Sequence, residues 1–152
     1  MKHIEVNIPE TLKAYIAGLV DGEGCLNMYK LKSKSCRQGW TFAGRMSISN
    51  CDLEALMEIQ QETGIGNIQK KTKQVGRRDG YNLVYSPREL RVLLPMLLPY
   101  LKIKKRQAIL LLKFLNTQKW GNSRDYFVTD EMWKERNSMR EEFSFLNRRG
   151  ER

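Results

Sequence analysis

The segment from Ala14 to Val20 has no charged residue over about two helical turns, and it constrains the fold more than any other part of the chain. A helix on the surface of a monomer normally presents a polar stripe to water. Ala14, Gly18 and Gly22 are four residues apart, so they share one helical face on which a second backbone can approach closely. Two interpretations stay open. The helix is buried within one domain, or it packs on its own copy across a two-fold axis through Ala14, Ala17, Gly18 and Asp21.

The sequence Asp21-Gly22-Glu23-Gly24 follows this segment and places two carboxylates at the end of a helix that we expect to stop at about Val20. The partial negative charge of a helix C-terminus favours a cation there. Mg²⁺ prefers a few carboxylates together with water and phosphate oxygens. One chain offers too few such ligands, whereas two copies of Glu23 around a phosphodiester offer enough. The alternative is that Asp21 and Glu23 are turn and solubility residues. We expect Asp21 to brace the helix ends rather than to perform chemistry.

The charge balance points to a polyanionic partner. The chain of 152 residues contains 27 Lys and Arg against 17 Asp and Glu, a formal net charge of +10. An excess of this size in a small domain indicates nucleic acid first and an anionic membrane surface second. The most apolar stretches are too short to span a bilayer and the first residues carry no signal core, so we expect a soluble intracellular protein without a membrane partner. Its compartment stays open between an organelle (chloroplast or mitochondrion) and a bacterial cytoplasm.

The cysteines indicate neither a zinc site nor a disulfide framework. Cys25, Cys36 and Cys51 are odd in number and widely spaced, and the only histidine of the chain is His3. We expect them to be small, buried or half-buried residues.

Hydrophobic periodicity and capping signals predict an α+β chain with the order α-β-β-α-β-β-α, followed by further helices. The clearest strand is Trp40–Ser49, where apolar and polar residues alternate. Asp52 and the box Ser86–Glu89 predict helix starts, and the helix after Ser86 should bend or end near Pro95 or Pro99. The remaining expected elements are a helix from Pro9, strands at 25–30, 66–73 and 81–85, and helices ending near Gly64, over 102–118 and over 130–145. We expect one domain over 1–152, with a core at about 8–118 and a helical extension at about 119–152.

Three segments carry a family resemblance. Ile16–Gly24 resembles the LAGLIDADG motif of homing endonucleases, with Gly22 as a frequent variant of the Ala and Glu23 in place of the second Asp. Ser47–Asp52 with the following Gly64-Ile65-Gly66 resembles the segment that ends the second strand in this family. Tyr100–Ala108 is similar to the basic segment after the third helix. The three segments occur in the family's order and together cover most of the region from Leu12 to Leu115, and no second LAGLIDADG-like motif is present.

The resemblance implies a curved, antiparallel, four-stranded DNA-binding sheet and a homodimer that cleaves both strands of a long, roughly palindromic DNA target. Glu23, Lys104 and Asn50 fall on catalytic positions of the family, and Glu23 and Gly22 on its metal position. The expected cofactor is Mg²⁺; Mn²⁺ can substitute, and we expect Ca²⁺ to support binding without cleavage.

The sheet would lie in the DNA major groove, which is wide enough for strands. Side chains on its polar face would contact bases, and basic side chains in the hairpin loops would hold phosphates. The expected face residues are Asn27, Tyr29, Thr41, Arg45, Ser47, Ser49, Gln69, Lys71, Lys73 and Asn82. The expected loop residues are Lys32, Lys34, Arg37, Arg77 and Arg78.

Three other functions stay open. The chain could be a DNA-binding regulator that has lost cleavage, or a maturase that binds the RNA of its own intron. It could also be an unrelated basic dimerisation module, in which case Gly18→Leu would be tolerated.

Overall fold

The computed structural model describes residues 4–34, 36–72, 75–118 and 128–148. This part of the chain contains a four-stranded sheet and five helices in the predicted order, so the expected α+β architecture is confirmed. The elements are α1 (Glu10–Glu23), β1 (Gly24–Lys32), β2 (Trp40–Asn50), α2 (Leu53–Thr63), β3 (Asn67–Lys70), β4 (Tyr81–Tyr85), α3 (Pro87–Leu97), α4 (Lys105–Asn116) and α5 (Asp130–Leu146).

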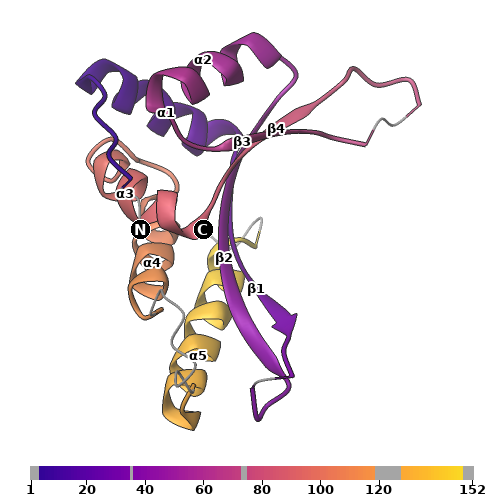
Figure 1. Cartoon of the computed structure of the whole chain (residues 1–152), viewed down its shortest axis with the longest axis vertical. Helices are drawn as coiled ribbons and strands as arrows, with labels where there is room; N and C mark the ends of the chain where they lie inside the picture. Colours follow the sequence, from indigo (N-terminus) through magenta and orange to yellow (C-terminus); the bar gives the residue numbers. More distant parts are fainter. Residues whose placement is uncertain (1–3, 35, 73–74, 119–127, 149–152) are drawn as a thin grey trace.

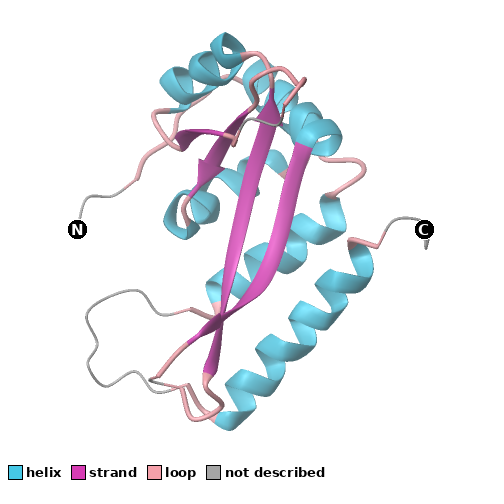
Figure 2. Cartoon of the chain, turned by 90° about the vertical axis from the view of Figure 1, so that its right-hand side faces the viewer, coloured by secondary structure: helices cyan, strands magenta, loops and turns pink. Residues whose placement is uncertain are grey.

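The sheet is antiparallel throughout, with the strand order β1-β2-β4-β3. It curves along the long strands β1 and β2, and the described helices lie on one side of these two strands (Figure 1). Figure 2 looks onto the opposite side, where the strands lie in front of the helices. One face of β1 and β2 is therefore covered by helices, and the other is open.

The core lies between the sheet and the helices. Leu26, Met28, Phe42, Met46 and Ile48 alternate along β1 and β2 and are all buried, as their strand period predicts. They pack with the leucines of α3 and with apolar residues of α4. A Cβ atom on Gly44 of β2 would lie 2.6 Å from Cδ1 of Leu111, so the glycine lets α4 approach the strand.

Local capping signals set several helix ends as predicted. Asp52 accepts a hydrogen bond from the Ala55 N–H (3.1 Å) at the start of α2. Ser86 and Glu89 form both hydrogen bonds of a capping box, and α3 ends at Leu97, between Pro95 and Pro99. Among the described residues, no helix is long and apolar enough to cross a lipid bilayer.

Helix α1 is longer than predicted, because it continues from Val20 through Asp21 and Gly22 to Glu23. Gly22 is tolerated inside the last turn, and β1 begins directly at Gly24. A Cβ atom on Gly24 would lie 2.7 Å from Cα of Val20, so only glycine fits this abrupt change from helix to strand. Both carboxylates therefore stand on the last helical turn rather than in a loop.

Three further expectations need correction. Helix α4 begins at Lys105 instead of Lys102, and β3 ends at Lys70. Cys25 and Cys51 are exposed, so their predicted burial was wrong, while Cys36 is half-buried as expected. Cys25 is the second residue of β1, and Cys51 directly follows the last residue of β2.

Candidate functional site

A hollow lies at the C-terminal end of α1, and we call it the α1-end hollow. It brings together the last turn of α1, the start of β1, the segment that precedes α4 and the end of α5. Its lining residues are Asp21, Gly22, Glu23, Gly24, Cys25, Leu26, Ile103, Lys104, Gln107, Leu146 and Asn147. Glu23, Gly22 and Lys104, which the sequence assigned to one site, thus share one hollow although about eighty residues separate the two segments.

Lys104 is held against the end of α1. Its Nζ donates hydrogen bonds to the carbonyl oxygens of Val20 and Asp21, both at 2.9 Å. The carbonyls of the last helical turn carry partial negative charge, so an ammonium group is a favourable cap even though the Val20 oxygen also accepts from the Gly24 N–H. This contact fixes a positive charge at the edge of the hollow that Glu23 lines.

Asp21 braces the same end of the helix, as predicted. Its carboxylate accepts hydrogen bonds from the backbone N–H groups of Lys102 (2.8 Å) and Lys104 (2.9 Å). Partial burial alone would raise the pKa of Asp21, but these backbone donors and the charge of Lys104 hold the pKa below its ordinary value of 3.8. The same contacts explain why α4 starts late, since residues 102–104 are committed to Asp21.

The donor set within one chain is small. Glu23 and Gly22 are exposed on the last turn of α1, whereas the Asp21 carboxylate is occupied by backbone N–H groups. Over the described residues, no group of three or more His, Cys, Asp or Glu side chains could hold a metal ion. The exposed carboxylate of Glu23 is an oxygen donor of the kind that hard cations prefer.

Asn50 does not share this hollow. It ends β2, and its Oδ1 accepts a hydrogen bond from the Asp52 N–H (3.0 Å), which makes it a turn residue before α2. It lines a different hollow together with Arg78 and Tyr81. The structure therefore brings Glu23 and Lys104 together within one chain and leaves Asn50 apart.

A second hollow lies on the open face of the sheet, and we call it the sheet hollow. It contains seven of the predicted face residues in one place and adds Cys25, which also lines the α1-end hollow. Its lining residues are Cys25, Asn27, Tyr29, Arg45, Ser47, Ser49, Lys71 and Asn82. The strand register places these side chains together, because Asn27 faces Arg45 and Ser49 faces Asn82. The Ser49 hydroxyl also donates to Oδ1 of Asn82 (2.6 Å).

The other expected nucleic-acid contacts surround this hollow. Gln69 pairs with Asn82 across β3 and β4, and Thr41 is half-buried on β2. The loop residues Lys34, Arg37, Arg77 and Arg78 are exposed. Lys32 is exposed as well, but it is the last residue of β1 rather than part of the loop, and Lys73 lies outside the described residues. Arg37 is engaged within the chain, since its Nη1 lies 3.5 Å from Oδ2 of Asp130.

The predicted dimer residues separate into two groups. Ala14, Gly18 and Gly22 are exposed along one line of α1, and a Cβ atom on either glycine would meet nothing within 4 Å. Ala17 is fully buried in the core, so its assignment to a dimer surface was wrong: it offers no surface to a partner. Asp21 is directed to the 102–104 segment by its hydrogen bonds.

Two residues of the α1-end hollow were not found from the sequence. Nδ2 of Asn147 donates to the Leu26 carbonyl (3.0 Å), and Nε2 of Gln107 donates to the Leu146 carbonyl (3.3 Å). Gln107 is a buried polar residue on α4, and because it directly follows the basic run Lys104–Arg106, its burial had no signal in the sequence. Asn147 gave none, because its partner lies 121 positions away.

Comparison with known proteins identifies the class to which this fold belongs. The family model described as LAGLIDADG endonuclease matches residues 16–116, and the chain belongs to this family.

One relative supports this membership by sequence, and two solved structures share the fold. The chain is 30% identical over 134 residues to DNA endonuclease I-CvuI of Chlorella vulgaris. The matched region covers 82% of this chain and 76% of that protein. A structure of I-CvuI in complex with DNA in the presence of Mg, in which the DNA is not cleaved, matches with a TM-score of 0.71 at 23% identity, over 96% of this chain and 88% of that one. The archaeal intron-encoded homing endonuclease I-Vdi141I complexed with DNA matches with a TM-score of 0.75 at 22% identity, over 94% and 88% of the two chains.

Proposed function

We propose that this protein is a site-specific DNA endonuclease of the homing type, which cleaves both strands of a long, roughly palindromic target. One observation carries the proposal: the α1-end hollow and the sheet hollow adjoin at Cys25, so a face rich in hydrogen-bonding side chains leads directly to Glu23 and Lys104. Strands in the major groove read bases through side chains such as Arg45 and Asn82. The relatives I-CvuI and I-Vdi141I, both crystallised with DNA, support the same assignment.

In this proposal the protein works as a homodimer. Ala14, Gly18 and Gly22 form an exposed line of small residues on α1, and a Cβ atom on either glycine would meet none of the described residues within 4 Å, so their packing does not require glycine there. Close approach of a second α1 would require it. The two-fold would bring two copies of Glu23 together and give the target its palindromic symmetry.

The proposed cofactor is Mg²⁺, held by Glu23 beside Gly22 in each subunit and by phosphate oxygens of the DNA. An ion held there would supply Lewis-acid chemistry for activating water and for offsetting charge on the leaving oxygen. The chain's own residues do the rest. Lys104, fixed by the α1 carbonyls, keeps a positive charge next to Glu23 that offsets charge developing on the phosphate. Asp21 positions Lys104 by accepting a hydrogen bond from the backbone N–H of Lys104, and Asn50, which lines a different hollow, takes no part in this chemistry.

A cleavage selection tests this function. Purified protein is mixed with a randomised DNA library in Mg²⁺, in Ca²⁺ and in EDTA, and new ends are sequenced. We expect paired double-strand ends at one near-palindromic site in Mg²⁺ and binding without ends in Ca²⁺. Specific DNA binding without ends in any metal would instead identify a regulator. Affinity for structured RNA alone would identify a maturase, and no nucleic-acid affinity would leave a basic dimerisation module.

A further inference from the structure

The outer half of the β1–β2 hairpin is a two-stranded ribbon. Strand β4 pairs with β2 only between Met46 and Asn50, whereas β1 pairs with β2 all the way out to Lys32 and Trp40. Asn27, Tyr29 and Arg45 therefore stand at or beyond the edge of the four-stranded region. A two-stranded ribbon is marginally stable by itself in water, so its shape depends on what lies behind it.

Helix α5 lies behind this ribbon. It packs against β1, β2 and α4, and Figure 1 shows it running beside the two long strands. The Trp133 ring lies 5.5 Å from the Phe42 ring, and its Nε1–H donates to the Trp40 carbonyl (3.1 Å). Nζ of Lys30 lies 5.8 Å from the centre of the Trp133 ring. These contacts attach the first turns of α5 to both strands of the ribbon.

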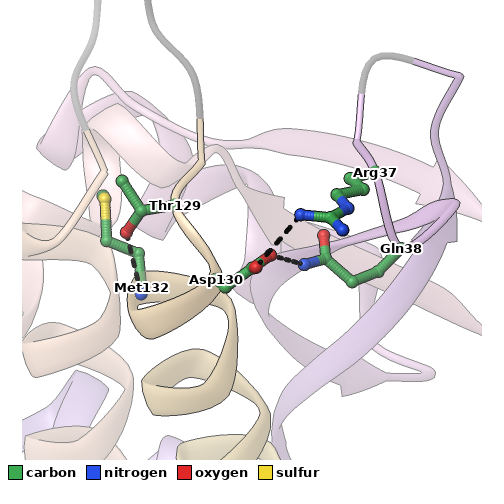
Figure 3. A network of polar contacts seen from close by, with 5 residues as sticks. All are labelled: Arg37, Gln38, Thr129, Asp130 and Met132. Atoms are coloured by element: carbon green, nitrogen blue, oxygen red, sulfur yellow. Dashed lines mark hydrogen bonds and ion pairs between the residues drawn. The ribbon is translucent and has the colours of Figure 1, made fainter.

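The start of α5 also holds the turn of the hairpin. Oδ1 of Asp130 accepts a hydrogen bond from Nε2 of Gln38 (2.5 Å), and Oδ2 lies 3.5 Å from Nη1 of Arg37 (Figure 3). Thr129 caps the helix by accepting from the Met132 N–H (3.2 Å), which fixes the turn that carries Asp130. Asp130 is thus placed on the first turn of a helix, where its charge is favourable, and it reaches 92 residues back along the chain.

The far end of α5 is fastened as well. Asn147 bonds to the Leu26 carbonyl next to the α1-end hollow. In the middle of the helix, the buried Arg136 donates from Nη2 to the Thr117 carbonyl at the end of α4 (3.0 Å). A helix anchored at the hairpin turn, at α4 and at the start of β1 can fix the angle between the ribbon and the α1-end hollow.

We propose that α5 is a brace that holds the two-stranded β1–β2 ribbon in position. In this proposal Asp130 and Trp133 are positioning residues, which set how the outer half of each DNA half-site is read. This inference rests on the proposed endonuclease function. Neither residue is assigned a contact with DNA. Their effect passes through Gln38, Arg37 and Trp40 to the side chains on the open face of the ribbon.

The first test needs no DNA. Hydrogen exchange of the backbone amides of β1 and β2 is compared in wild type, Asp130→Ala and Glu131→Ala. Glu131 is exposed on the same helical turn, so its variant removes the same charge and serves as the matched control. We expect faster exchange in the outer ribbon for Asp130→Ala alone. Equal exchange in all three proteins would contradict the proposal that Asp130 on α5 holds the ribbon in position.

The second test uses the DNA target identified by selection. Cleavage of single-base variants of that target is measured at outer and at central positions. Asp130→Ala should lower discrimination at outer positions by about threefold to tenfold, the size expected for a lost charged hydrogen bond at the surface, with the cleavage rate of the intact target at saturation unchanged. Asp130→Asn, which keeps an acceptor for Gln38, should restore most of it, and Trp133→Phe should show a smaller loss.

The outcomes separate the two claims. A uniform loss at all positions, or the same profile for Glu131→Ala, would overturn the brace while the endonuclease stands. A wild-type protein that neither binds nor cuts DNA would overturn the proposed function, and the exchange measurement would still decide whether α5 fixes the ribbon.

Discussion

The α1-end hollow and the sheet hollow are built from different kinds of contact. In the first, a few hydrogen bonds join the end of α1 to residues 102–104, and each involves a particular side chain, Asp21 or Lys104. In the second, strand register lines up side chains from β1, β2 and β4, and the Ser49 hydroxyl donates to Asn82 across two of these strands. The chemistry proposed for the α1-end hollow should therefore depend on single residues, whereas recognition by the sheet hollow should be shared among many.

The largest effect should come from the exposed line of small residues on α1, through which two subunits would meet in the proposed dimer. Gly18→Leu fits the isolated chain, because a Cβ atom there meets nothing, but it would block close approach of a second α1. Inserting methylenes into a packed contact costs ~1–3 kcal/mol, and a two-fold axis repeats this in both subunits. Sedimentation should show loss of the dimer, with DNA cleavage lost in parallel. A folded variant that remains dimeric would remove α1 from the interface.

Next in size is the fixed charge of the α1-end hollow. Lys104→Met removes the ammonium at the end of α1, and we expect the single-turnover cleavage rate to fall by about 10²–10³-fold, as for loss of one preorganised electrostatic group. Lys105→Met removes the same charge one residue later on an exposed position and serves as the control. If both variants slow cleavage equally, the charge acts through the general field and not through its position.

The sheet hollow should respond more weakly and more selectively. Arg45→Ala removes a long donor that faces Asn27 across the strand pair, and we expect a loss of ~1–3 kcal/mol in binding, confined to one base pair of each half-site. Competition binding with single-base target variants measures this. An equal loss on every DNA sequence would reassign Arg45 to phosphate contact.

The smallest effect concerns stability. In Asp21→Asn the carboxylate that accepts from Lys102 and Lys104 becomes a neutral amide, and we expect a loss of about 1 kcal/mol at neutral pH because the group is only partly buried. Since the folded-state pKa of Asp21 is lowered, the wild type holds its advantage above the ordinary pKa of 3.8 and loses it as the pH falls further. Urea unfolding at about pH 6 and pH 3 should show the gap between the proteins closing in acid. A gap that widens in acid would contradict this role for Asp21.

The parts of the molecule that were predictable are those with local causes. Alternation along Trp40–Ser49 placed the core face of β2 correctly, and the capping box at Ser86 placed the start of α3. The end of α1 and the start of α4 were misplaced because Asp21 and Lys104 bond across 83 residues. Ala17 was misassigned because a helix without a polar face has no sequence signal that separates its core side from its outer side. The anchoring of α5 through Asp130 and Asn147 depends on distant partners in the same way.

The most direct test of the difference between the two hollows is Glu23→Gln on the selected DNA target, with affinity measured in Ca²⁺ and the cleavage rate measured in Mg²⁺. Glu23 is exposed at the end of α1 and lines the α1-end hollow but not the sheet hollow, so the substitution should leave recognition intact. We expect wild-type affinity together with a cleavage rate lowered by at least about a thousandfold. Cleavage at the wild-type rate by Glu23→Gln would contradict the assignment of catalysis to the end of α1.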